Sequence, residues 1–349
     1  MRIFRGSLVA VLALSALSAS ACKKAEDKKD PTAAKVEEKK ADVGSAGSAA
    51  VAVTKAADPA PVAMSQATGD DLSLLPANSE IVLGINFQQL QASPLWKQFV
   101  EPQMMKDMSK IEEFKAKCGF NPLESVQTIS MGMTNVGGST KPDVSMVVHG
   151  LDKTKMSACF DKMKDEAAAK GSEITKDGDV VLVKNAEGMA AMTFVNDTTM
   201  IISAPNGSKD SLMKMAKGDS ALKSSQQFVD MFSKINAHDT IWGLANGSSK
   251  AFAMAANAGM KFKAVYGSVN VTDGLALDVR ARMDSADQAT SLVTMAKGKA
   301  DQVKGMVDKL DITNDGADVK VNVAMSQEKL KALAGLAMSG MGGGGMGAP

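Results

Sequence analysis

The chain has 349 residues, of which 45% are apolar and only 4% aromatic, and 25 are methionines. This length suffices for one large or two modest domains, with cores built from small aliphatic and adaptable thioether side chains. The 40 basic and 39 acidic residues nearly cancel. Such a balance argues against a nucleic-acid-binding protein, which normally carries a basic stripe.

The first 21 residues predict a signal peptide. Arg2 and Arg5 make a basic start, and residues 8–17 form an apolar run that is shorter than the roughly 20 residues of a membrane-spanning helix. The small residues 19–21 then precede Cys22. This arrangement resembles the lipobox of bacterial lipoproteins, although alanine stands where that family usually has leucine, three residues before the cysteine. The resemblance implies cleavage before Cys22 and a lipid on its thiol.

The lipid would anchor the protein to a membrane, since two or three acyl chains bind firmly where one binds only marginally. In enterobacteria an aspartate next to the cysteine retains lipoproteins in the inner membrane, and this chain has Lys23 there. The resemblance therefore implies the cell envelope, with a lipid anchor in the outer membrane and the body facing the periplasm. The alternative is an ordinary secretory peptide, cleaved after Ala21, which would leave a free Cys22.

Residues 22–71 predict a lipidated cysteine followed by a disordered linker. The stretch runs through KKAEDKKD, KVEEKKAD and GSAGSAAVAV, with no aromatic residue. Charged sequence rich in Ala, Ser and Gly cannot bury enough apolar surface to fold. A flexible chain of this length would have a reach of about 40 Å, so we expect a solvated tether rather than a site for cell-wall polymer.

Folded sequence is expected to begin at residue 72, and residues 72–235 form the first predicted repeat. Its expected elements, in chain order, are strands at 81–87, 126–134 and 144–149, a helix at 152–170, a meander of short strands at 174–203, and two helices. Asp177-Gly178 and Asn196-Asp197 lie between apolar segments. Such pairs predict tight turns of β-hairpins.

Residues 236–339 repeat much of this order, with a flexible Gly/Met tail expected at 340–349. Residues 240–246 match 81–87 with Gly243 on Gly84, and residues 311–323 match 173–183 with Asp315-Gly316 on Asp177-Gly178. Between them, residues 275–283 alternate apolar and charged side chains, which predicts a half-buried strand. The fold class is therefore α+β, as a duplicated unit of antiparallel sheet with helices packed on one face.

This layout resembles a loosely defined set of uncharacterised bacterial envelope proteins with duplicated α+β bodies. Their halves open with a leucine-proline-alanine phrase before a strand, and here Leu75, Pro76 and Ala77 precede Ile81. The resemblance covers roughly residues 72–340 and implies no known activity.

Two cysteines lie within the predicted body, Cys118 and Cys159. In an exported protein such a pair most simply forms one disulfide. Two buried free thiols are the alternative if the chain stays in the cytosol. A CxxC motif is absent from the sequence, so redox catalysis is not expected.

The sequence offers little for catalysis or metal binding. His149 and His238 are the two histidines, and neither has a neighbour that would orient it as a base. We therefore expect no enzyme and no cofactor. Methionine is the compositional oddity, because thioethers suit Cu(I) but more often fill cores. Clusters stand at Met104, Met105 and Met108, at Met131 and Met133, and at Met338, Met341 and Met346 in the tail.

The preferred function is a non-catalytic binding or scaffolding module of the envelope. Its expected partners are the membrane, through the N-terminal lipid, and an apolar ligand, a peptide or another protein, with no nucleic acid. A sheet covered by helices can leave a concave apolar surface for such a ligand. Copper handling, with Met338, Met341 and Met346 as weak candidates, and an enzyme of unrecognised type are the alternatives.

Overall fold

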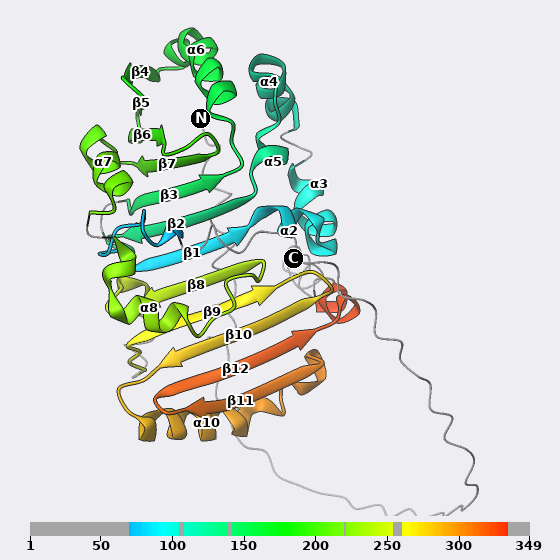
Figure 1. Cartoon of the computed structure of the whole chain (residues 1–349). Coiled ribbons are helices and arrows are strands. Elements are labelled where there is room, and N and C mark those ends of the chain that lie inside the picture. The colour runs from blue at the N-terminus through cyan, green and yellow to red at the C-terminus, as the bar shows by residue number, and fades with distance from the viewer. Residues whose placement is uncertain (1–69, 105–107, 139–140, 220, 254–259, 334–349) are drawn as a thin grey trace, which may run out of the picture. The chain divides into compact units, whose positions relative to one another are not determined.

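The computed structural model describes residues 70–104, 108–138, 141–219, 221–253 and 260–333. The predicted signal peptide, Cys22, nearly all of the predicted linker, and the tail with Met338, Met341 and Met346 lie outside the described residues. What is described has the expected α+β class, with one antiparallel sheet and helices beside it (Figure 1).

The sheet has 12 strands in the order β11-β12-β10-β9-β8-β1-β2-β3-β7-β6-β5-β4. The first half of the body supplies β1 (Ile81–Asn86), β2 (Thr128–Thr134), β3 (Asp143–His149), β4 (Glu173–Asp177), β5 (Val180–Asn185), β6 (Gly188–Phe194) and β7 (Thr199–Ala204). The second half supplies β8 (Ile241–Asn246), β9 (Ala264–Asn270), β10 (Leu275–Arg282), β11 (Lys309–Asp315) and β12 (Asp318–Met325).

The described helices connect these strands, and α2, α6, α7, α8 and α10 pack against the sheet. Between β1 and β2 lie α2 (Phe87–Ala92), η2 (Trp96–Val100), α3 (Glu101–Met104), α4 (Met108–Cys118) and α5 (Pro122–Ser125). Later in the chain come α6 (Lys153–Ala169), α7 (Lys209–Lys217), η4 (Leu222–Ser224), α8 (Gln226–Phe232), η5 (Lys250–Phe252), α10 (Ala286–Ala300) and η6 (Lys304–Met306).

Local sequence explains the main boundaries. Asp152 caps α6 by accepting a hydrogen bond from the backbone N–H of Lys155, as aspartate commonly does at a helix start. Both predicted glycine turns are present: Gly178 joins β4 to β5 with φ of 63°, and Gly316 joins β11 to β12 with φ of 56°. This left-handed conformation costs glycine little because it has no Cβ.

The two halves meet where β1 pairs with β8. Leu83 lies opposite Gly243, and Gly84 lies opposite Trp242. The two strands share one burial pattern along their length, which makes Gly84 equivalent to Leu244. The alignment of Gly84 with Gly243 predicted from sequence is therefore wrong by one residue. In a strand, such a shift moves every side chain to the opposite face.

The second half has the order β8-β9-β10-α10-β11-β12, and the first half has β1-β2-β3-α6-β4-β5 with β6 and β7 added after it. Because β7 pairs with β3, it occupies the place beside β3 that β12 occupies beside β10. The repeat in sequence thus corresponds to a repeat in topology, with one hairpin added to the first half.

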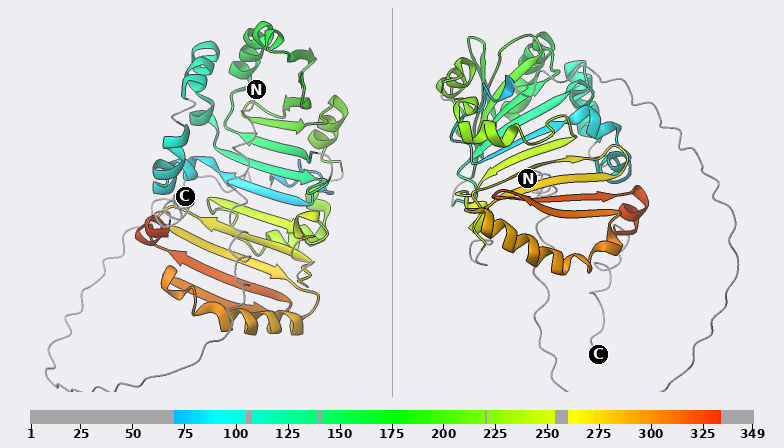
Figure 2. Two further views of the ribbon diagram at one scale, coloured as in Figure 1. Left: turned by 180° about the vertical axis from the view of Figure 1, so that it is seen from behind. Right: turned by 60° about the horizontal axis from the view of Figure 1, so that its bottom comes forward.

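Helices lie on both faces of the sheet, so the expectation that they pack on one face needs correction. On one face α7 and α8 cover a core that contains Val147 and Ile201; on the other, α6 covers a core that contains Val148 and Met200 (Figure 2). Neighbouring residues of β3 and of β7 are thus apolar on opposite faces. Strands buried on both sides read as continuous apolar runs, and such runs give no sign of which face a helix covers.

Candidate functional site

The face of the sheet that carries α6 and α10 is apolar across its centre. Cross-strand pairing aligns Ile81 with Met133 and Ala245, Leu83 with Met131, and Ile241 with Val269. We call this central surface the apolar trough, and its members are Ile81, Leu83, Ile85, Met131, Met133, Ile241, Ala245, Val265, Val269, Leu277 and Val279.

The trough exists because β1, β2, β8, β9 and β10 alternate in side-chain character. Every second residue is apolar on the trough side, or is one of the paired glycines Gly243 and Gly267. These two glycines leave the middle of the surface without a side chain. A Cβ on Gly267 would lie 2.1 Å from the carbonyl oxygen of Asp278, so the backbone itself keeps this position free of side chains.

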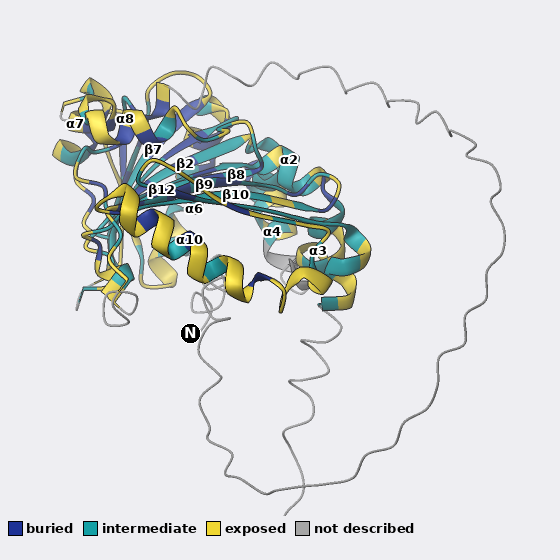
Figure 3. Ribbon diagram, turned by 90° about the horizontal axis from the view of Figure 1, so that it is seen from below, coloured by how far each residue is buried: buried dark blue, intermediate teal, exposed yellow. Residues whose placement is uncertain are grey.

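Two clusters form the rims of the trough. On one side Met156 and Cys159 of α6 pack with Val148 and Met200; on the other Ala289 and Val293 of α10 pack over β11 and β12. Figure 3 shows α10 on the opposite side of the sheet from α7 and α8. A helix is about 10 Å in diameter, so the floor of the trough lies below the outer surface of both rims.

No helix among the described residues brings a buried core over the centre of the trough. Its members are all partly exposed, and none belongs to the cores under α6, α8 or α10. Five strands separate the rims, which corresponds to about 24 Å at the usual strand spacing. A contiguous, partly exposed apolar surface of this kind is a candidate binding site.

A cavity of about 530 Å³ lies at the end of the sheet next to the trough, where β8 ends and β9 begins, and Gln227 of α8 also lines it. Phe252, Met260 and Phe262 give it apolar walls, and the two aromatic rings meet edge to face with centroids 6.1 Å apart. Lys261 and Lys263 also line it. Both lysines are exposed. We call this cavity the end pocket.

The charge of the end pocket is positive. Lys263 lies 3.6 Å from Asp284, which also lines the pocket, while no ion pair involves Lys261 among the residues that the structure describes. The end pocket thus joins an apolar wall to an excess of positive charge. One of its lysines, Lys263, lies two residues before Val265 of the trough floor in the chain.

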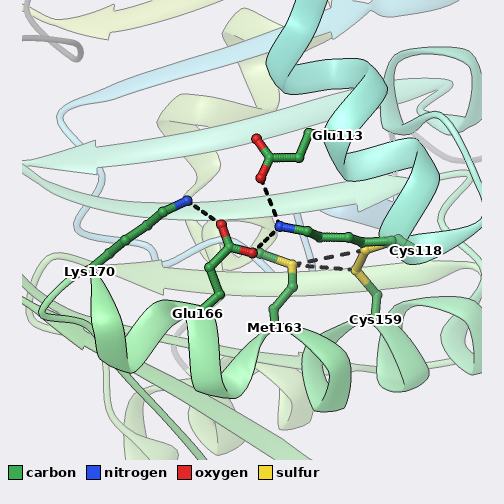
Figure 4. Close-up of polar contacts among 7 residues, drawn as sticks. Glu113, Cys118, Cys159, Met163, Glu166 and Lys170 are labelled. Atoms are coloured by element: carbon green, nitrogen blue, oxygen red, sulfur yellow. Dashed lines mark hydrogen bonds and ion pairs between the residues drawn. A yellow bond between two sulfur atoms is a disulfide. The ribbon is translucent and has the colours of Figure 1, made fainter.

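The α6 rim holds the predicted disulfide. Cys118 at the end of α4 is bonded to Cys159 of α6, which is fully buried. The thioether of Met163 packs against both sulfurs, 3.5 Å from that of Cys159 (Figure 4). The bridge ties α4 to α6 and therefore fixes this side of the trough.

Ion pairs reinforce the same contact between α4 and α6. Lys117 pairs with Glu113 at 2.8 Å and also with Glu166, which in turn pairs with Lys170 (Figure 4). Hydrogen bonds from Lys117 and Lys170 lower the pKa of Glu166 to about 2. Hydrogen bonds that Lys117 donates to Glu113, which has the larger effect, and to Glu166 raise the pKa of Lys117.

Two buried polar clusters lie on the opposite face of the sheet. In the first half, Asp71 is 1% exposed and accepts hydrogen bonds from Ser130 Oγ at 2.5 Å; it also lies 2.7 Å from His149 Nε2. The other ring nitrogen of His149 lies 3.1 Å from the Thr199 hydroxyl. Both ring nitrogens of His149 thus have polar partners, and Asp71 ties the start of the folded body to the sheet.

The second cluster occupies the equivalent strand positions. Asp318 accepts hydrogen bonds from Arg282 Nε at 2.8 Å, Tyr266 Oη at 2.7 Å and Lys234 Nζ at 2.9 Å. Burial raises the pKa of the Asp318 carboxyl, but these three donors outweigh it and hold the pKa well below its usual range. Burial and the bond to Asp318 raise the pKa of Tyr266 to about 12.

The remaining predicted residues fall in four places. Met104 ends α3 and Met108 begins α4, while Met105 lies outside the described residues. His238 lies in an exposed turn before β8. Met131 and Met133 lie on the floor of the trough, and within the described part of the chain no group of three or more His, Cys, Asp or Glu side chains is placed to hold a metal ion. Cys22, Met338, Met341 and Met346 fall outside the described residues.

Sequence reasoning missed Asp71 and the lysines of the end pocket. Asp71 and His149 are 78 residues apart, so no local pattern joins them. Lys261 and Lys263 alternate with Met260 and Phe262, and this alternation next to a strand is the signal that a closer reading would have used.

Comparison with known proteins adds a likeness in fold. No protein-family model matches the chain, and no curated protein sequence matches it. The crystal form III structure of TP0453 is similar with a TM-score of 0.46 and 8% identity, over 75% of this chain and 96% of that one. Crystal form I of the same protein gives 0.41 and 9%, over 75% and 95%.

None of the helices described between residues 70 and 333 is long and apolar enough to cross a bilayer.

Proposed function

We propose that this chain is a non-catalytic binding protein of the cell envelope, anchored by a lipid on Cys22, whose apolar trough receives an apolar ligand or partner. The observation that carries the proposal is the contiguous, partly exposed apolar surface between the α6 and α10 rims. The disulfide in the α6 rim supports an extracytoplasmic location, because disulfides persist mainly in oxidising compartments.

The energetics favour such a ligand. Covering apolar surface gains roughly 25 cal/mol per Å², so a ligand that buries about 300 Å² of the trough would gain roughly 7 kcal/mol before the cost of association. The floor residues lie on paired strands of one sheet, so they need little rearrangement to bind. On a preformed surface, the entropic cost of ordering the site offsets little of this gain.

The test uses the chain from Lys23 onward, which keeps every described element, titrated with the neutral apolar dye Nile red. The wild-type chain is expected to bind the dye and shift its emission to the blue. Val279→Glu places a charge on the floor opposite Gly267 and should weaken binding about tenfold, because the ligand would bury the carboxylate.

Met213→Glu is the matched control. Met213 is 41% exposed on α7, which covers the opposite face of the sheet, so dye binding by this variant should equal that of the wild type. Absence of dye binding, or equal binding by Val279→Glu, would contradict the proposed function.

The anchor has its own test. The intact mass of protein from the membrane fraction should correspond to residues 22–349 plus a glycerolipid. A mass without lipid would overturn the anchored location and leave the binding proposal to the dye experiment.

A further inference from the structure

The chemistry of the trough floor selects among apolar ligands. No side chain of the trough contains a hydrogen-bond donor or a strong acceptor. A peptide laid on this surface would bury backbone N–H and C=O groups without partners, at about 1–3 kcal/mol each. A hydrocarbon chain has no such groups, so the floor suits an acyl chain better than a polypeptide.

The end pocket supplies what a lipid headgroup needs. Lys261 and Lys263 outnumber the single carboxylate of Asp284 in its lining, which makes the pocket complementary to an anion. Phe252 and Phe262 in the same lining continue the apolar surface toward these charges. A ligand with a hydrocarbon chain at one end and a phosphate at the other matches this order.

The dimensions agree with a single lipid rather than a bilayer surface. One acyl chain spans about 15 Å, half the hydrocarbon thickness of a membrane, and the floor is about 24 Å across. The helices of both rims stand on the same face as the floor. A flat membrane would therefore meet the rims first, whereas individual acyl chains can lie between them.

Resting on the proposed function, we infer that the trough binds one anionic phospholipid, with its acyl chains on the floor and its headgroup at Lys261 and Lys263. The lysines determine which headgroup is preferred, and the floor holds the chains of any lipid that enters.

The experiment incubates the chain from Lys23 onward with vesicles of pure phosphatidylglycerol or pure phosphatidylcholine. The vesicles are then removed by flotation, and lipid retained by the soluble protein is counted by native mass spectrometry. The wild-type chain is expected to retain about twofold more phosphatidylglycerol than phosphatidylcholine, the preference that one exposed cation in excess provides, since Lys263 already pairs with Asp284.

Variants separate the parts of the site. Lys261→Ala with Lys263→Ala should remove the preference while retention of phosphatidylcholine persists, and Val279→Glu should reduce retention of both lipids. Lys214→Ala with Lys217→Ala changes two exposed lysines of α7 on the opposite face and should leave the preference unchanged.

Three outcomes would overturn the inference. Equal retention of the two lipids by the wild type would contradict the preference for an anionic headgroup, although an apolar binding site would stand. Nile red binding without lipid retention would support the proposed function but contradict a phospholipid as the ligand. Flotation of the protein with the vesicles, with no lipid in the soluble fraction, would indicate adsorption to the bilayer instead.

Discussion

The indole ring of Trp242 in β8 lies over Gly84 in β1, where the two halves of the sheet join. A Cβ on Gly84 would lie 2.1 Å from the ring, and Trp242 is 2% exposed in the core. The ring also meets Phe232 of α8 edge to face, with centroids 5.1 Å apart. The absence of a side chain at Gly84 thus allows the largest core residue to cross the joint between the halves.

Gly84→Ala should therefore destabilise the protein by about 2–3 kcal/mol, as overpacking of a rigid core does. Gly243→Ala is the control in the same pair of strands, because its Cβ would come close only to the flexible end of Leu83, at 2.8 Å, with the backbone oxygen of Val82 at an ordinary 3.5 Å. Its cost should stay below about 1 kcal/mol. Urea unfolding measures both, and equal losses would contradict the packing argument.

Removing the charge of Asp318 should cost about 3 kcal/mol in Asp318→Asn, because Arg282, Tyr266 and Lys234 would lose the carboxylate charge and one of its two acceptor oxygens. The depressed pKa of Asp318 also makes the free energy of unfolding depend on pH. Its stabilisation is complete above the ordinary aspartate pKa of about 4 and is lost as the pH falls below that value.

The measurement is the free energy of unfolding between pH 2 and pH 7. The wild-type value should fall toward low pH more steeply than that of Asp318→Asn. Asp165→Asn, on the exposed side of α6, should leave the wild-type slope unchanged. Parallel slopes for the wild type and Asp318→Asn would show that the cluster does not carry this pH dependence.

Tyr266 should ionise with a midpoint near pH 12, against about 10 for a free tyrosine. The chain contains one tyrosine, so the phenolate absorbance near 295 nm reports on this residue alone. Asp318→Asn should lower the midpoint because it removes the carboxylate that opposes the phenolate. A wild-type midpoint near 10 in the folded protein would contradict the buried hydrogen bond.

Reduction of the bond between Cys118 and Cys159 should destabilise the protein by about 4 kcal/mol, because the bridge closes a loop of 41 residues. The double variant Cys118→Ala with Cys159→Ala should show a similar loss in urea unfolding. Its stability should not respond to reductant, which separates the bridge from other effects of the reagent. If reductant left the urea midpoint of the wild type unchanged, the disulfide would not contribute to the stability of the protein.

Local pattern predicted the parts of the fold that depend on neighbours in sequence. The turns at Gly178 and Gly316 and the half-buried strand predicted at residues 275–283 are confirmed because each is fixed within a few residues. The disposition of helices over two faces was not predictable, because Val147 and Val148 are equally apolar and only tertiary packing decides which helix covers each.

The candidate site was predicted only in kind. An apolar surface between sheet and helices was expected, but its position follows from the distance between α6 and α10 across five intervening strands, which no short stretch of sequence encodes. The end pocket likewise combines Lys261 and Lys263 with Phe252, and the pairing of β8 with β9 brings the segments that follow and precede these strands together.

The pairing of β1 with β8 has a consequence for the order in which the chain assembles. Ile81 finds its partner Met133 within about fifty residues, but its other partner, Ala245, is more than 160 residues away. Until β8 is available, β1 is an unpaired apolar edge, and such edges pair readily with other chains. A chain truncated before residue 241 should therefore self-associate, whereas the complete chain protects that edge with its own second half.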